Sequence, residues 1–99
     1  MEKLVRDRIP EIIKADRGEM PPFRIAPQAE YRELLTEKLS EETEEYLESR
    51  EPEELADILE VVLALAREVG LSPQALEELR REKAQVRGGF DNRIVMDFP

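Results

Sequence analysis

Apolar residues recur every three or four positions over most of the chain, and short segments containing proline or glycine interrupt them. Residues at that spacing share one face of an α-helix, so the pattern predicts helices. The expected helices cover residues 8–16, 28–49, 52–69 and 73–87. Gly18, Pro52, Gly70 and Ser72-Pro73 stand at their ends, where such residues are favoured. The expected fold class is all-α, an antiparallel bundle of three to four helices with short extended segments at both termini.

The segments outside these helices give weaker signals. Asp7 is a candidate N-cap for the first helix. Residues 19–28 contain three prolines and are expected to form an extended loop, within which residues 23–26 are a candidate edge strand. Residues 93–98 are expected to form a short strand or an extended tail. Arg6 and Asp7 are interpreted as an ion pair at the start of the first helix.

Each of the two long helices carries carboxylates on its apolar side. At about 100° per residue, the helix over 28–49 places Glu42 inside its apolar stripe and Glu45 at the edge, with Glu41 turned away. That stripe consists of Leu35, Leu39 and Tyr46. On the helix over 52–69, Glu54 lies in line with the apolar residues and Asp57 flanks it. Other glutamates are interpreted as parts of solvated helix faces, three on the helix over 28–49 and two on the helix over 73–87: Glu37, Glu44, Glu48, Glu77 and Glu78.

The short connection through Ser49-Arg50-Glu51-Pro52 favours an antiparallel pair of long helices. This pairing would bring Glu42 and Glu45 close to Glu54 and Asp57. Converging carboxylates in an apolar interior repel one another and are costly unless a cation joins them. A hard divalent cation is the natural counter-charge, with Mg²⁺ expected first and Mn²⁺ as an alternative.

Lysine and arginine side chains are candidates for substrate binding beside such a site. Lys83 and Arg87 lie one turn apart on the apolar face of the last helix. They would either contact phosphates or close the acidic site through salt bridges, and the spacing favours neither. Lys38, at the start of the acidic stretch, is a third candidate.

Composition excludes several classes of function. At 99 residues, with 40% hydrophobic and 39% charged residues, the chain is expected to be one globular domain. The absence of cysteine and histidine excludes disulfides, thiol or histidine catalysis, and the usual zinc sites. The net charge of −9 argues against a nucleic-acid polymer or an anionic membrane as partner. We expect a cytoplasmic protein, because neither a signal peptide nor a run of transmembrane length is apparent.

The helix over 52–69 is apolar almost all the way round. A helix of that kind is buried on every side, and so short a chain offers few neighbours to cover it. A second copy of the chain would supply them, so a homo-oligomer is expected.

Four segments of the chain, taken in order, resemble the MazG-like branch of the all-α nucleoside triphosphate pyrophosphohydrolases. They are KLVRDRIPEII, KLSEETEEYLE, EELADILEVVLAL and REKAQVRGGFDNRIV. The resemblance implies a dimer or tetramer and Mg²⁺-dependent hydrolysis of a nucleotide to its monophosphate and pyrophosphate. It implies that Lys83 and Arg87 match a basic position of the third family motif. The acid pattern of the family, EExxE followed by ExxD, falls on Glu41, Glu42, Glu45, Glu54 and Asp57.

Among these five acids, the resemblance implies that Glu42, Glu45, Glu54 and Asp57 are metal ligands. Glu41 would help to bind or activate water. The loop between the two acid motifs is shorter than is typical of the family, which leaves less material to shape a pocket for the base. The expected function is house-cleaning hydrolysis of nucleoside triphosphates. The alternatives are phosphoribosyl-ATP pyrophosphohydrolase of histidine biosynthesis, and a non-catalytic acidic module that binds a metal or a partner.

Overall fold

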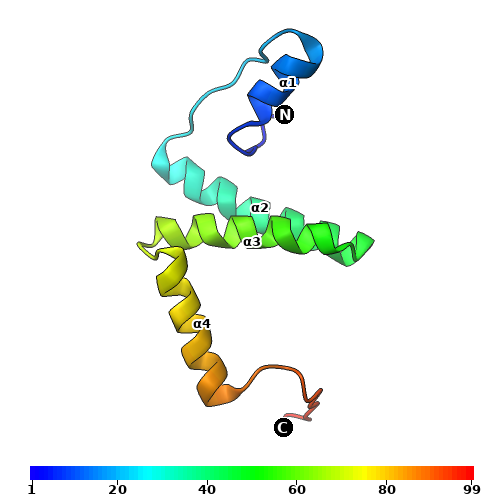
Figure 1. Cartoon of the computed structure of the whole chain (residues 1–99), viewed down its shortest axis with the longest axis vertical. Coiled ribbons are helices and arrows are strands. Elements are labelled where there is room, and N and C mark those ends of the chain that lie inside the picture. Colours follow the sequence, from blue (N-terminus) through cyan, green and yellow to red (C-terminus); the bar gives the residue numbers. More distant parts are fainter. The chain divides into compact units, whose positions relative to one another are not determined.

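The computed structural model describes residues 1–99 and contains four α-helices and no strand (Figure 1). The helices are α1 (Ile9–Arg17), α2 (Gln28–Ser49), α3 (Pro52–Glu68) and α4 (Pro73–Arg87). The all-α class is therefore confirmed, and each helix lies within one residue of its expected bounds. The chain divides into two compact units, Met1–Leu65 and Ala66–Pro99.

Left-handed residues end two of the helices where the sequence indicated. Gly18 follows α1 with φ 80°, and its N–H donates to the carbonyl of Lys14 at 2.7 Å. Glycine has no Cβ, so it adopts this conformation without steric cost. Arg50 takes the same conformation after α2, with φ 59°, and its N–H donates to the carbonyl of Tyr46. The turn at Arg50 and Glu51 then leads directly into α3.

Two expectations about the ends and extent of the secondary structure are wrong. The N-cap of α1 is Arg8, not Asp7, and no side chain caps this helix. Pro10 lies in its first turn and lacks an N–H, so one of the amides that a cap would satisfy is missing. Residues 23–26 form no strand, because they have no neighbouring strand to pair with. For residues 93–98 the expectation was a short strand or an extended tail; they form no strand, and the Arg93 N–H donates to the Phe90 carbonyl in the turn before them.

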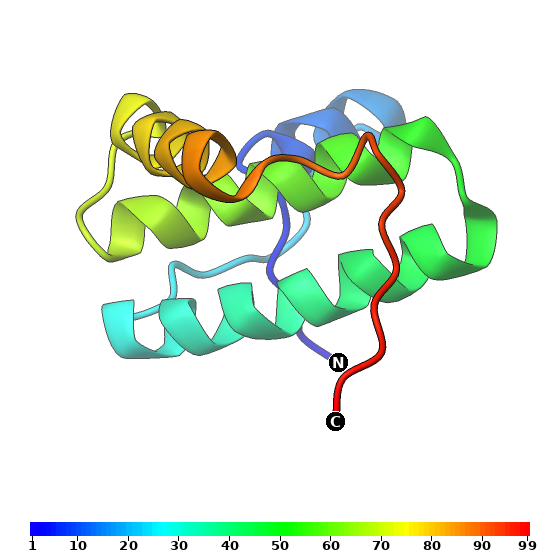
Figure 2. The same ribbon diagram turned by 90° about the horizontal axis from the view of Figure 1, so that it is seen from below.

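Within the first unit, α2 and α3 lie side by side and run antiparallel, as Figure 1 and Figure 2 both show. Leu35 of α2 is only 4% exposed and forms the core with Val61 and Ala64 of α3. Leu39, Leu65, Tyr31 and Leu4 pack against this core. The apolar stripes expected on the two long helices therefore do face each other, and Leu4 adds the N-terminal segment to them.

The N-terminal segment, residues 1–6, is also held by Arg24 in the loop before α2. The Arg24 guanidinium donates to both carboxylate oxygens of Glu2 at 2.9 and 3.0 Å and to both of Glu30 at 2.8 and 2.7 Å. These hydrogen bonds hold the pKa of the Glu2 and Glu30 carboxyls below the ordinary value. Glu2 and Leu4 thus fix the segment, and Lys3 and Arg6 project from it.

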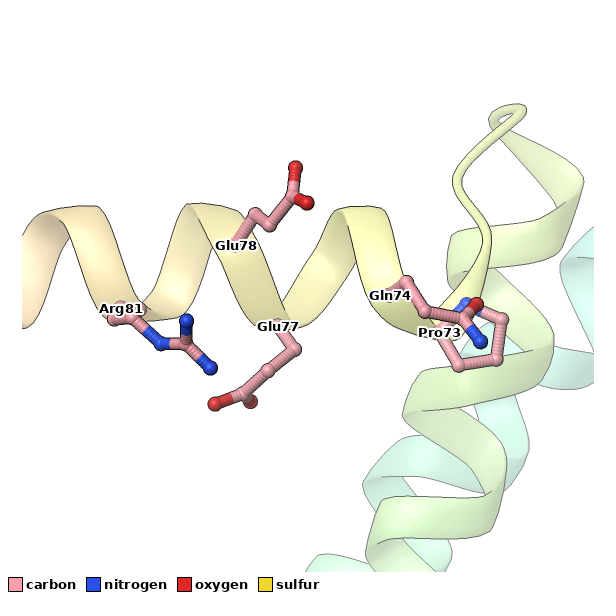
Figure 3. A pocket seen from close by; sticks show the side chains of 5 residues that line it. All are labelled: Pro73, Gln74, Glu77, Glu78 and Arg81. Carbon is pink, nitrogen blue, oxygen red and sulfur yellow. The ribbon is translucent and has the colours of Figure 1, made fainter.

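The second unit contains α4, which begins as the sequence indicated. The Ser72 hydroxyl accepts the N–H of Ala75 at 3.1 Å, and Gly88 ends the helix. Figure 3 shows a surface hollow on α4 whose lining side chains are all exposed: Pro73, Gln74, Glu77, Glu78 and Arg81. Glu77 accepts a hydrogen bond from Arg80 at 2.8 Å, which lowers its pKa. This is the solvated face expected for Glu77 and Glu78, and Glu37, Glu44 and Glu48 on α2 are exposed as well.

No helix is both long enough and apolar enough to cross a membrane.

Candidate metal centre

Three carboxylates from the two long helices meet in the first unit. Glu42 comes from the C-terminal half of α2, and Glu54 and Asp57 come from the beginning of α3. One oxygen atom from each lies within 4.8 Å of the others, so the group could hold a metal ion. The spacing of three residues places Glu54 and Asp57 on one side of α3, and the antiparallel pairing of the helices brings Glu42 opposite them.

Glu42 is the most deeply placed of the three acids. Its side chain is 10% exposed, and its Oε2 is buried without a hydrogen-bond partner. Its Oε1 lies 3.5 Å from the Nζ of Lys38. Burial raises the pKa of the Glu42 carboxyl, the nearby Glu45 and Asp57 carboxylates raise it further, and Lys38 opposes them. A buried carboxylate oxygen that lacks a donor is costly, and a cation between the three acids would remove that cost.

The other two acids of the motif lie differently. Glu45 is exposed and is outside the group of three, although its charge is close enough to raise the pKa of Glu42. Glu41 is half-buried, and its carboxylate accepts a hydrogen bond from Lys3 at 3.2 Å and lies 3.9 Å from the Nζ of Lys38. The helical wheel turned Glu41 away from the apolar stripe, and the N-terminal segment is what covers it. The ligand role of Glu45 and the water-binding role of Glu41 stay predictions.

The N-terminal segment brings a cation to α3 that the sequence did not indicate. The guanidinium of Arg6 donates to the Asp57 carboxylate at 2.7 Å, across 51 residues of sequence. Arg6 is therefore not the partner of Asp7. The available signal was the excess of acids in the two acid motifs, which requires positive charge from elsewhere in the chain, and the start of the chain carries Lys3, Arg6 and Arg8.

The charges gathered at this centre do not balance. Three cations face the acids, namely Lys3, Arg6 and Lys38. Three carboxylates converge here, namely Glu42, Glu54 and Asp57, and Glu41 and Glu45 lie near them. The acids therefore outnumber the cations, and a bound cation would offset the excess negative charge.

The donor set indicates which metals suit the centre. All the ligand atoms that it offers are carboxylate oxygens, and the chain has no cysteine or histidine to favour zinc or copper. Oxygen ligands suit Mg²⁺, Ca²⁺ and Mn²⁺. Lys83 and Arg87 are exposed on α4, in the second unit, and their part in substrate binding stays a prediction.

Comparisons of the chain with protein-family models, with curated proteins and with solved structures find no match.

Proposed function

We propose that this chain is a divalent-metal-dependent nucleoside triphosphate pyrophosphohydrolase of the MazG-like kind. The observation that supports it most is the convergence of Glu42, Glu54 and Asp57, with a buried oxygen of Glu42 left without a donor. Such a site needs a cation, and a divalent ion held by few carboxylates is the usual partner of nucleotide phosphates. The resemblance of the acid pattern to that of the MazG-like enzymes is what links this chemistry to pyrophosphate release.

The proposed reaction adds one water molecule across the α–β phosphoanhydride bond. The products are a nucleoside monophosphate and pyrophosphate. Glu42, Glu54 and Asp57 would hold Mg²⁺, or Mn²⁺ in its place. When bound, the ion neutralises phosphate charge and favours attack by water. Glu41, at the rim of the centre, would orient that water.

Positive side chains would bind the phosphates that the metal leaves free. Lys38 is one of the three expected from the sequence, and its Nζ lies 3.9 Å from the Glu41 carboxylate and 3.5 Å from that of Glu42. We propose the same role for Lys83 and Arg87 of α4, whose spacing of one turn suits two contacts with one phosphate chain.

The test is product identification with a panel of nucleoside and deoxynucleoside triphosphates, and phosphoribosyl-ATP, in Mg²⁺. The expected result is equal amounts of monophosphate and pyrophosphate from at least one triphosphate, and no turnover in EDTA. Turnover of phosphoribosyl-ATP alone would assign the histidine-pathway reaction instead. Mg²⁺ binding by calorimetry without turnover of any substrate would favour the non-catalytic module.

We also propose that the protein is a homodimer or homotetramer. Leu55 and Leu59 lie one turn apart on α3 and are 50% and 56% exposed. These side chains belong to the helix expected to be apolar on every side, and the core of a single chain leaves them uncovered. Light scattering is expected to give two or four times the chain mass of 11.5 kDa. The mass of one chain at micromolar concentration would contradict the proposal.

A further inference from the structure

The N-terminal segment places two cations beside the acids of the two long helices. Lys3 reaches Glu41 on α2, and Arg6 reaches Asp57 on α3. Leu4, between them, packs against the core, so both cations start from a fixed piece of backbone. Arg24 holds the neighbouring Glu2. A segment that belongs to neither acid motif therefore contacts both motifs, through Lys3 at Glu41 and Arg6 at Asp57.

Both cations remain open to a further ligand. The side chains of Lys3 and Arg6 are 56% and 57% exposed. A guanidinium has five N–H donors in a planar fork, and one hydrogen bond to Asp57 is formed here. Exposed ion pairs of this kind contribute little to stability, so the fold does not depend on keeping them closed. Arginine binds phosphate through two parallel hydrogen bonds, a geometry that suits its open position at the rim.

We propose that Arg6 and Lys3 bind the phosphate chain of the substrate at the metal centre. This inference rests on the proposed function and adds a substrate-binding element to it. A nucleoside triphosphate carries more negative charge than one divalent ion neutralises, and these two cations lie beside the acids that would hold the ion. A divalent ion would compete with Arg6 for Asp57, and the guanidinium released from Asp57 would then bind phosphate oxygens.

Arg6 would bind phosphate and would compete with the metal ion for Asp57, so its removal should affect the two ligands differently. Arg6→Gln should weaken phosphate binding, because hydrogen bonds to charged groups are lost. It should not weaken Mg²⁺ binding, because the cation that competes for Asp57 is gone. A residue that only supports the arrangement of the carboxylates would instead lower both affinities together.

The experiment is calorimetric titration with Mg²⁺ alone, and then with inorganic tripolyphosphate in the presence of Mg²⁺. Tripolyphosphate carries the phosphate chain without a base, so the result does not depend on nucleotide preference. Arg6→Gln and Lys3→Gln are expected to bind it about 10- to 100-fold more weakly than the unmodified chain. For Arg6→Gln, the affinity for Mg²⁺ is expected to be unchanged or up to about fivefold higher.

Arg8→Gln is the matched control. Arg8 is exposed, two residues after Arg6, and lies 4.0 Å from Glu11 without contact to the acid centre. This variant is expected to bind both ligands like the unmodified chain. Arg6→Lys keeps the charge without the planar fork and should give an intermediate tripolyphosphate affinity. Thermal melts of all four variants check that each one is folded.

Two results would overturn the inference alone: normal tripolyphosphate affinity in both Arg6→Gln and Lys3→Gln, or a parallel loss of Mg²⁺ and tripolyphosphate affinity in Arg6→Gln. If the unmodified chain binds Mg²⁺ but not tripolyphosphate and hydrolyses no nucleotide, the proposed function falls and the inference falls with it. Hydrolysis by the unmodified chain together with normal binding by these variants leaves the proposed function intact.

Discussion

Glu54→Gln is expected to lower the rate of nucleotide hydrolysis by about 100- to 1000-fold, and Glu53→Gln is expected to leave it nearly unchanged. The two residues are neighbours in the first turn of α3 and have the same side chain. Glu54 is half-buried and belongs to the group of three acids, whereas Glu53 is exposed. A metal contributes several kcal/mol to stabilising charge in the transition state, and each 1.36 kcal/mol is a factor of ten in rate.

The measurement is kcat at saturating nucleotide and high Mg²⁺, so that a weakened metal site is not mistaken for a lost one. Asp57→Asn is expected to act like Glu54→Gln, because it removes another charged oxygen from the same group. Circular dichroism checks that the helices remain. Normal turnover in both Glu54→Gln and Asp57→Asn would show that the acid centre takes no part in the reaction.

The helices and their core could be predicted from the sequence because local rules determine them. Apolar spacing, proline in first turns and glycine at helix ends act over a few residues, and nothing distant opposes them. Leu35 was expected on the apolar stripe of the helix over 28–49, and it is buried against Val61 of the facing helix. The same reasoning identified Glu42 as the carboxylate inside an apolar stripe. Its burial is the strongest agreement between the expected site and the structure.

The partner of Arg6 could not be predicted by the same rules. Asp7 is adjacent in sequence, so a local ion pair was the simplest interpretation. Asp57 is 51 residues away, yet it is the residue that binds Arg6, because Leu4 packs on the core and thereby places Arg6 at the start of α3. Helical spacing describes faces of one helix at a time and does not show which segment crosses them. The helical wheel could not predict the salt bridge between Lys3 and Glu41 for the same reason.

The wrong local expectations have a different cause. Asp7 and residues 23–26 fit the composition of a cap and of a strand, but composition does not supply a partner. A strand needs a second strand within hydrogen-bonding distance, and in this all-helical chain none exists. Residues 23–26 instead supply Arg24, which holds the N-terminal segment through Glu2. The segment that failed as a strand thus contributes to the position of Lys3 and Arg6 beside the metal centre.

Glu42→Gln is expected to raise the free energy of unfolding of the metal-free protein by about 0.5 to 2 kcal/mol, the usual gain when one unfavourable residue is replaced. The Glu42 carboxylate is buried beside Asp57, and its Oε2 has no donor. Glutamine keeps the shape and removes the charge. Each 1 kcal/mol corresponds to about 4 to 8 °C in Tm for a domain of this size. Glu44→Gln, at an exposed position of α2, is the control and should melt like the unmodified chain.

Metal should reverse this order of stability. Burial raises the pKa of Glu42 above its ordinary value of 4.5, so its ionised form costs folding free energy that grows as pH rises through the raised pKa. In EDTA, the advantage of Glu42→Gln should therefore be small in acid and larger at neutral pH. Mg²⁺ at about 100 times its Kd should stabilise the unmodified chain by about 2.7 kcal/mol and the variant far less. A variant that melts lower than the unmodified chain in EDTA at neutral pH, yet still gains full stability from Mg²⁺, would show that Glu42 is not a ligand.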